Sequence, residues 1–98
     1  MKLVRDFIPR IIEESGKSCN YHIADGEEFI QELYTKMTEE LNEFIEDPSI
    51  EEAADMYEVL TTICWYHEIQ LEHVTKKAAE KKHRCGGFVE GIILESVE

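Results

Sequence analysis

The sequence predicts an all-α fold, an antiparallel bundle of about four helices in one domain. Apolar residues recur every three or four positions through most of the chain, which is the period of a helix with one buried face. The breaks between these stretches fall at Gly16, at the Asp-Pro pair 47–48 and at the Gly-Gly pair 86–87, which are typical helix ends. A length of 98 residues suits one domain, and no internal repeat marks a second, so we assign residues 1–98 to a single domain.

The first predicted helix covers residues 6–15, where isoleucines recur at helical spacing before Gly16. Pro9 fits this helix only in its first turn. Residues 20–24 are too short for a helix and alternate like a brief strand. The apolar tail, residues 88–97, can pair with this strand, which would add a small terminal β pairing to the bundle.

Two long helices are predicted next, over residues 27–46 and 49–67, each with an apolar face. Asp47 and Pro48 separate them, and Ser49 is a usual residue for a helix start. Because the connecting loop is short, the two helices should pack antiparallel as a hairpin. A further helix is predicted over residues 71–83.

The charge of the chain restricts its partners. Formal net charge is −12, with 22 acidic against 10 basic residues, so nucleic acid and anionic membranes would be repelled. Thirteen acids lie between Asp25 and Glu58, where Lys36 is the only base. Five of the ten bases lie between Lys76 and Arg84. Phosphates could therefore bind the second region directly, and the first only through a metal.

The three cysteines are odd in number and lack the spacing of a zinc site, so we expect reduced thiols in a cytoplasmic protein. No apolar run reaches the ~18 residues that span a bilayer. The first residues are charged and do not resemble a signal peptide. A domain this small buries too little surface to be very stable alone, so we also expect a homo-oligomer.

Four carboxylates stand out by their helical positions. Glu40 and Glu43 lie at the edge of the apolar face of the first long helix. Glu52 lies near the middle of the apolar face of the second, and Asp55 follows one turn later. A carboxylate directed at a core costs several kcal/mol unless a cation compensates it, and residues 37–75 contain no lysine or arginine. Mg²⁺, which prefers oxygen ligands, would compensate several carboxylates at once.

Simpler interpretations of the same residues remain open. Ser49 and Glu52 match a capping box, in which Glu52 folds back onto the Ser49 amide. Acidic helix faces are usually just solvated, and the basic stretch 76–84 suits a solvated helix C-terminus. The placement on two helices favours a metal site modestly. No Gly-rich phosphate loop, nucleophile elbow or Cys/His dyad is present.

The acidic segments EELNE (39–43) and EAAD (52–55) resemble the EExxE…ExxD signature of the all-α NTP pyrophosphohydrolases. That superfamily includes MazG-like proteins, dimeric dUTPases and phosphoribosyl-ATP pyrophosphohydrolase. The opening KLVRDFIP (2–9) and the ending GGFVEGI (86–92) resemble a compact MazG-related branch, so the resemblance covers nearly the whole chain. Two positions depart from the pattern of that branch. Phe7 stands where the branch often has a basic residue, and Cys85, directly before the Gly-Gly pair, stands where it often has arginine.

The resemblance implies a helical bundle completed by dimerisation, as a homodimer or homotetramer, that hydrolyses a nucleotide between its α- and β-phosphates with Mg²⁺ or Mn²⁺. It implies metal ligands at Glu40, Glu43, Glu52 and Asp55. The candidate catalytic residues are Glu39 and Glu40, with Glu39 orienting a ligand or the attacking water. The candidate substrate-binding residues are Lys2, Arg5, Lys36 and Arg84.

Two other functions remain open from the sequence. The chain can be a non-catalytic helical module whose acidic face docks a basic partner or mimics nucleic acid. It can also be a metal-dependent hydrolase or regulatory sensor that binds a modified nucleotide and turns it over slowly. Base and sugar preference are not determined by the sequence.

Overall fold

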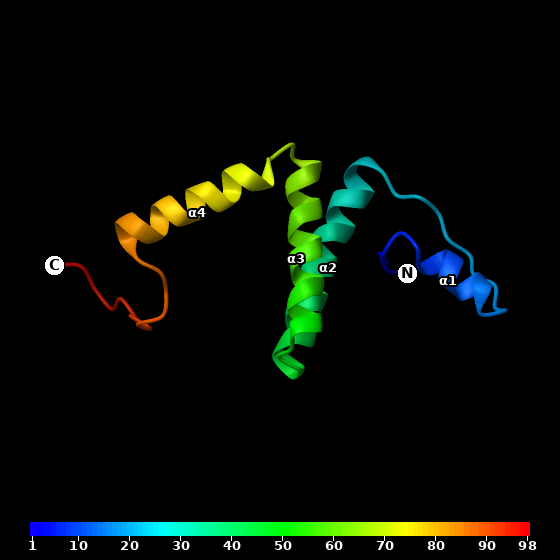
Figure 1. The fold of residues 1–98 in the computed structure, drawn as a ribbon, viewed down its shortest axis with the longest axis horizontal. Coiled ribbons are helices and arrows are strands. Elements are labelled where there is room, and N and C mark those ends of the chain that lie inside the picture. Colours follow the sequence, from blue (N-terminus) through cyan, green and yellow to red (C-terminus); the bar gives the residue numbers. More distant parts are fainter.

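The computed structural model describes residues 1–98 as four helices without strands (Figure 1). This confirms the all-helical class and the four predicted helices. The predicted β pairing does not form, because residues 20–24 and 88–97 have no regular structure and lie on opposite sides of the molecule. The helices are α1 (Ile8–Glu14), α2 (Gly26–Glu46), α3 (Ile50–Tyr66) and α4 (Leu71–Cys85).

Helices α2 and α3 form the predicted antiparallel hairpin, and they lie side by side in Figure 1. Asp47 and Pro48 end α2, and the Ser49 hydroxyl caps α3 by accepting a hydrogen bond from the Glu52 amide at 3.2 Å. The apolar faces of the two helices meet in a small core. Its buried members are Ile30, Leu33 and Val59, and packed against them are Leu3, Phe29, Met37, Ile63 and Tyr66.

The segment before α1 packs beside the hairpin (Figure 1). Leu3 packs against the hairpin core, and Arg5 forms an ion pair with Asp55 on α3. Pro9 lies in the first turn of α1, as predicted, and α1 itself buries no residue. The segment therefore adds a third wall beside the two long helices.

Helix α4 extends away from the hairpin and buries no residue, and the tail beyond it bends back below α4 before it reaches the C-terminus, far from the hairpin (Figure 1). Tail side chains such as Phe88 and Val89 are almost fully exposed. The molecule measures 62 × 31 × 23 Å, with a radius of gyration of 17.8 Å. A compact domain of this length has a radius of gyration of about 13 Å, so a single chain forms an open arch with much apolar surface uncovered.

The three cysteines, Cys19, Cys64 and Cys85, are free thiols. Cys64 is buried on α3, whereas Cys85 is exposed at the end of α4. None of the four helices combines the length and the apolarity that crossing a lipid bilayer requires.

Candidate metal centre

Three carboxylates meet between α2 and α3. One oxygen each from Glu40, Glu52 and Asp55 lies within 4.8 Å of the other two. Glu40 comes from α2, and the other two residues come from the first two turns of α3. Such a group of hard oxygen ligands is suited to a divalent cation such as Mg²⁺, after a small inward rotation of the side chains.

The helical period explains why these residues meet. Glu40 lies seven residues after Leu33 and three after Met37, so it continues the stripe of α2 that packs in the core. On α3, Glu52 and Asp55 precede the buried Val59 by seven and four residues, which puts both on its inner face. The antiparallel hairpin then places the two stripes face to face.

Two oxygens of the cluster are buried without a hydrogen-bond partner, Glu40 Oε2 and Glu52 Oε2. Glu40 is only 4% exposed. Leaving a buried acceptor of this kind unpaired costs about 1–3 kcal/mol, and more when the group is charged. The cluster therefore has free acceptor capacity at a buried place, as a cation site requires.

The charges around Glu52 also favour a cation site. Loss of solvent around the carboxyl raises the pKa of Glu52 above its ordinary value, and the negative charges of Glu43 and Asp55 raise this pKa further. Smaller contributions in the same direction come from Glu40 and Asp47. A bound cation would favour the ionised form and would offset this repulsion.

Helix capping explains the role of the Glu52 backbone amide but not that of its carboxylate. Its amide donates to the Ser49 hydroxyl, which is the first half of a capping box. The second half is absent, because the Glu52 carboxylate makes no hydrogen bond to the Ser49 amide and its Oε2 has no partner. The carboxylate thus has no structural role as a cap.

The other two predicted acidic site residues lie at the margin of the cluster. Glu43 is exposed and is not one of the three grouped carboxylates, although it is close enough for its charge to act on Glu52. Glu39 is partly exposed, and its Oε2 lies 3.6 Å from the Lys36 ammonium. Both can approach the cluster only by side-chain rotation.

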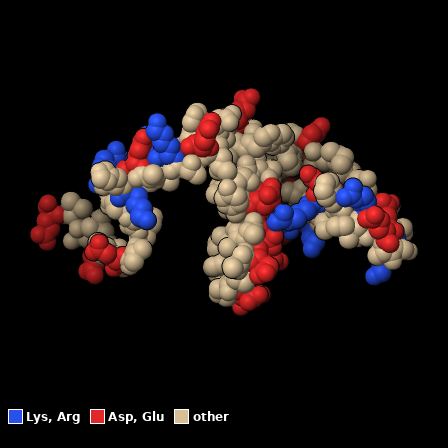
Figure 2. All heavy atoms as spheres, viewed as in Figure 1, with Lys and Arg blue, Asp and Glu red and all other residues tan.

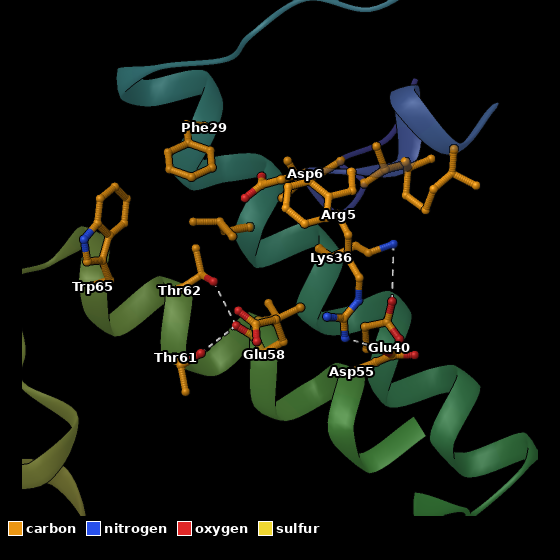
Figure 3. A pocket seen from close by; sticks show the side chains of 17 residues that line it. Arg5, Asp6, Phe29, Lys36, Glu40, Asp55, Glu58, Thr61, Thr62 and Trp65 are labelled. Atoms are coloured by element: carbon orange, nitrogen blue, oxygen red, sulfur yellow. Dashed lines mark hydrogen bonds and ion pairs between the residues drawn. The ribbon is translucent and has the colours of Figure 1, made fainter. Parts of the chain in front are cut away.

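Two cations accompany the carboxylates (Figure 3). Arg5 Nη2 lies 2.7 Å from Asp55 Oδ1, and Lys36 Nζ lies 3.3 Å from Glu40 Oε1. The hydrogen bond with Asp55 is the main reason that the pKa of the Arg5 guanidinium is raised. Periodicity could not have indicated this compensation by Arg5, because it comes from a segment fifty residues away from Asp55.

The remaining predicted substrate-binding residues are not brought to the cluster. Lys2 is exposed and forms no ion pair. Arg84 lies in the last turn of α4, where its Nε contacts Cys85 Sγ at 3.5 Å. Figure 2 shows the basic atoms of the α4 arm well apart from the acidic side of the hairpin. Within one chain, Arg84 therefore cannot reach an anion held at the cluster.

A cavity of about 850 Å³ adjoins the carboxylates and was not foreseen from the sequence. Its walls come from the N-terminal segment, α2 and α3, and Glu40, Asp55, Arg5 and Lys36 lie along it (Figure 3). This volume is in the range of small-molecule pockets. The arrangement can hold a divalent cation, an anion beside it and an organic group in the adjoining space.

Comparisons with protein-family models, with curated proteins and with solved structures give no match to this chain.

Proposed function

We propose that this chain is a Mg²⁺-dependent nucleotide pyrophosphohydrolase. It would convert a nucleoside triphosphate or related nucleotide and water to the monophosphate and pyrophosphate, by cleavage between the α- and β-phosphates. One observation carries the proposal: Glu40 and Glu52, brought together by α2 and α3, each keep a buried oxygen without a partner. The same residues belong to the EELNE and EAAD segments that resemble the pyrophosphohydrolase signature.

The donor set fits Mg²⁺. Glu40, Glu52 and Asp55 would hold the ion, and exposed Glu43 is the proposed fourth ligand. All are carboxylates, and no imidazole or thiolate that would favour zinc joins the cluster. When bound, the ion supplies Lewis-acid activation of phosphate oxygens and of water.

The basic residues at the cluster have the position to bind phosphate. Arg5 and Lys36 now pair with Asp55 and Glu40, which are proposed metal ligands. Once those carboxylates face a metal ion, the two cations are free to donate hydrogen bonds to phosphate oxygens beside it. The carboxylates thus hold these side chains in position before the substrate arrives.

Glu39 is the proposed general base. It is not one of the three grouped carboxylates and it stays partly exposed, so it is available to accept a proton from the attacking water. No Ser, Cys or His arranged as an activated nucleophile lies along the cavity. Direct attack by water on the α-phosphorus, without a covalent intermediate, therefore suits the residues that are present.

The proposal includes a homodimer. Only five residues of the isolated chain are buried, and large apolar side chains of the tail lie in solvent. Exposed apolar surface of this extent usually marks an interface. If Arg84 contacts phosphate, it must do so from a second chain, because α4 carries it away from its own hairpin.

A panel of NTPs and dNTPs with phosphoribosyl-ATP, incubated with Mg²⁺, tests the proposal when pyrophosphate is resolved from orthophosphate. Glu52→Gln should abolish pyrophosphate release. Glu51→Gln is the matched control, since Glu51 is the neighbouring acid of α3 and is exposed outside the cluster. Equal activity in both variants, or no turnover of any nucleotide with Mg²⁺ or Mn²⁺, would overturn the proposal.

A second candidate is a non-catalytic acidic module or a slow nucleotide sensor. It is favoured by the pairing of Arg5 and Lys36 with the carboxylates, which offsets part of the negative charge without a metal. Such a docking module would gain no thermal stability from millimolar Mg²⁺ and would bind a basic partner less tightly as salt rises. A sensor would bind nucleotide with Mg²⁺ but release pyrophosphate slowly.

A further inference from the structure

The cavity beside the carboxylates continues along α3 away from the cluster. It begins at Glu40, whose buried Oε2 is unpartnered, and at Asp55, and it reaches Trp65. Ten residues of helix separate Asp55 from Trp65, or about 15 Å. A nucleotide whose phosphates lie at the carboxylates would therefore direct its base toward the Trp65 end.

The walls of this cavity are apolar and aromatic. Phe29 and Leu33 from α2, Val59 and Trp65 from α3, and Leu3 from the N-terminal segment line it. Figure 3 shows the rings of Phe29 and Trp65 at the same end of the cavity. Aromatic faces of this kind stack on nucleobases irrespective of base identity. The walls thus suit a flat heterocycle, and discrimination between bases depends on the polar groups.

Most of the free polar side chains between the cluster and Trp65 accept hydrogen bonds. The hydroxyls of Thr61 and Thr62 both donate to the Glu58 carbonyl, each at 2.9 Å, so only their acceptor lone pairs remain free. The carboxylate of Glu58 has no hydrogen-bond or ion-pair partner in the chain, and neither has that of Asp6. Away from Arg5 and Lys36, the Trp65 indole N–H is the one free side-chain donor among the lining residues, and the other free polar side chains are acceptors.

An acceptor-lined pocket distinguishes bases by their exocyclic groups. Adenine, cytosine and guanine carry exocyclic amino groups that can donate to a carboxylate. Uracil and thymine present a carbonyl oxygen in place of the cytosine amino group, and hypoxanthine presents one in place of the adenine amino group. A carbonyl oxygen beside the Glu58 carboxylate would place two acceptors together without a donor between them.

We propose that this cavity is the nucleobase pocket of the site and that Glu58 selects bases with an exocyclic amino group. The inference rests on the proposed function, because it takes the phosphates to lie at Glu40 and Asp55. It assigns the aminated nucleotides as the substrate class and Glu58 as a specificity residue.

The first experiment measures base binding without hydrolysis. Trp65 is the only tryptophan and lines the cavity, so its fluorescence reports occupancy. CMP and UMP differ at the exocyclic group, and CMP should bind at least about 10-fold more tightly. In Glu58→Gln this ratio should fall below about threefold, since an amide can donate to the uracil oxygen as well as accept. Glu51→Gln, outside the cavity, should keep the ratio.

The second experiment compares kcat/KM for CTP with UTP and for ATP with ITP, with Mg²⁺, in the same proteins. The aminated member of each pair should be favoured at least about 10-fold, and Glu58→Gln should narrow the ratio while retaining turnover. No response of Trp65, equal binding of CMP and UMP, or a preference unchanged in Glu58→Gln would overturn the inference. A CMP preference without pyrophosphate release from any nucleotide would overturn the proposed function alone.

Discussion

Arg5 and Asp55, fifty residues apart in the chain, form an ion pair of 2.7 Å that joins the N-terminal segment to α3. Both side chains are partly exposed, so the pair itself contributes little to stability, about 0–1 kcal/mol. Its importance is positional. The pair places a guanidinium beside a proposed metal ligand, where it can exchange Asp55 for a phosphate group.

If Arg5 exchanges Asp55 for phosphate, Arg5→Gln should strengthen the binding of Mg²⁺ and weaken the binding of the nucleotide. Without nucleotide, Mg²⁺ should bind about threefold or more tightly, because Asp55 no longer has a competing cation. KM for the nucleotide should rise about 10-fold, because a charged phosphate contact is lost. Calorimetric titration measures the Mg²⁺ affinity, and steady-state kinetics measure KM. Arg10→Gln is the control, because Arg10 lies over the Phe7 ring and forms no ion pair with the carboxylates. Weaker Mg²⁺ binding in Arg5→Gln would contradict this role.

Mg²⁺ should stabilise the native protein and not the Glu40→Gln variant. Ligand at about 100 times its Kd adds about 2.7 kcal/mol to the free energy of unfolding, which raises Tm by about 10–20 °C in a domain of this size. Glu40 is the most buried of the proposed ligands, so its loss should remove most of this gain. Differential scanning fluorimetry with Mg²⁺ and with EDTA provides the measurement. Exposed Glu51→Gln should keep the full shift, and a full shift in Glu40→Gln would exclude Glu40 as a ligand.

The raised pKa of Glu52 predicts that the stability of the protein depends on pH, with opposite signs in the absence and in the presence of Mg²⁺. Its folded pKa lies above the ordinary value of 4.5, so between the two values the native state binds more protons than the unfolded state. This group therefore makes the metal-free protein more stable as pH falls through the raised pKa toward 4.5. With Mg²⁺ the trend should reverse, because protons compete with the ion for the carboxylate.

Urea unfolding between pH 5 and 8, in EDTA and in Mg²⁺, measures both trends. Glu52→Gln should remove this group's contribution in EDTA. Because Glu43, Asp55, Glu40 and Asp47 surround Glu52, the same comparison in Glu43→Gln should show a smaller slope. A slope in EDTA that is unchanged in Glu52→Gln would assign the pH dependence to other groups.

The hairpin core should be the main source of stability. Leu33 is 2% exposed at the contact of α2 with α3, so Leu33→Ala should lower the free energy of unfolding by about 2–5 kcal/mol. Leu41→Ala on the same helix removes a side chain that is 45% exposed and should cost less than about 1.5 kcal/mol in a single chain. Chemical denaturation measures both. A larger loss in Leu41→Ala would mean that a second chain covers this face.

The proposed dimer should depend on the apolar tail. Ile93 is 81% exposed, and Ile93→Asp should shift the sedimentation of the protein from dimer to monomer. Ser96→Asp adds the same charge in the same tail without removing apolar surface, so it should remain dimeric. A native protein that sediments as a monomer at micromolar concentration would refute the dimer.

The positions of the helices could be predicted because a helix depends on residues near one another in sequence. Residues 27–46 and 49–67 were expected to be helical, and α2 and α3 differ from these limits by one residue at most at each end. The limits of α1 and α4 differ from the predicted ones by two residues at most. The inner positions of Glu40, Glu52 and Asp55 follow from the same period, so their meeting across a short loop was predictable too.

Only the tertiary structure decided what surrounds those carboxylates. Glu43 shares the spacing of the signature, yet it is exposed, whereas Glu40, three residues earlier on α2, is buried. Arg5 reaches Asp55, and the adjoining cavity gains a third wall, because the N-terminal segment lies beside the hairpin. The expected strand pairing fails, because α4 carries the tail away from residues 20–24. Such relationships join distant parts of the chain, so they depend on its path in space and leave no periodic signal in the sequence.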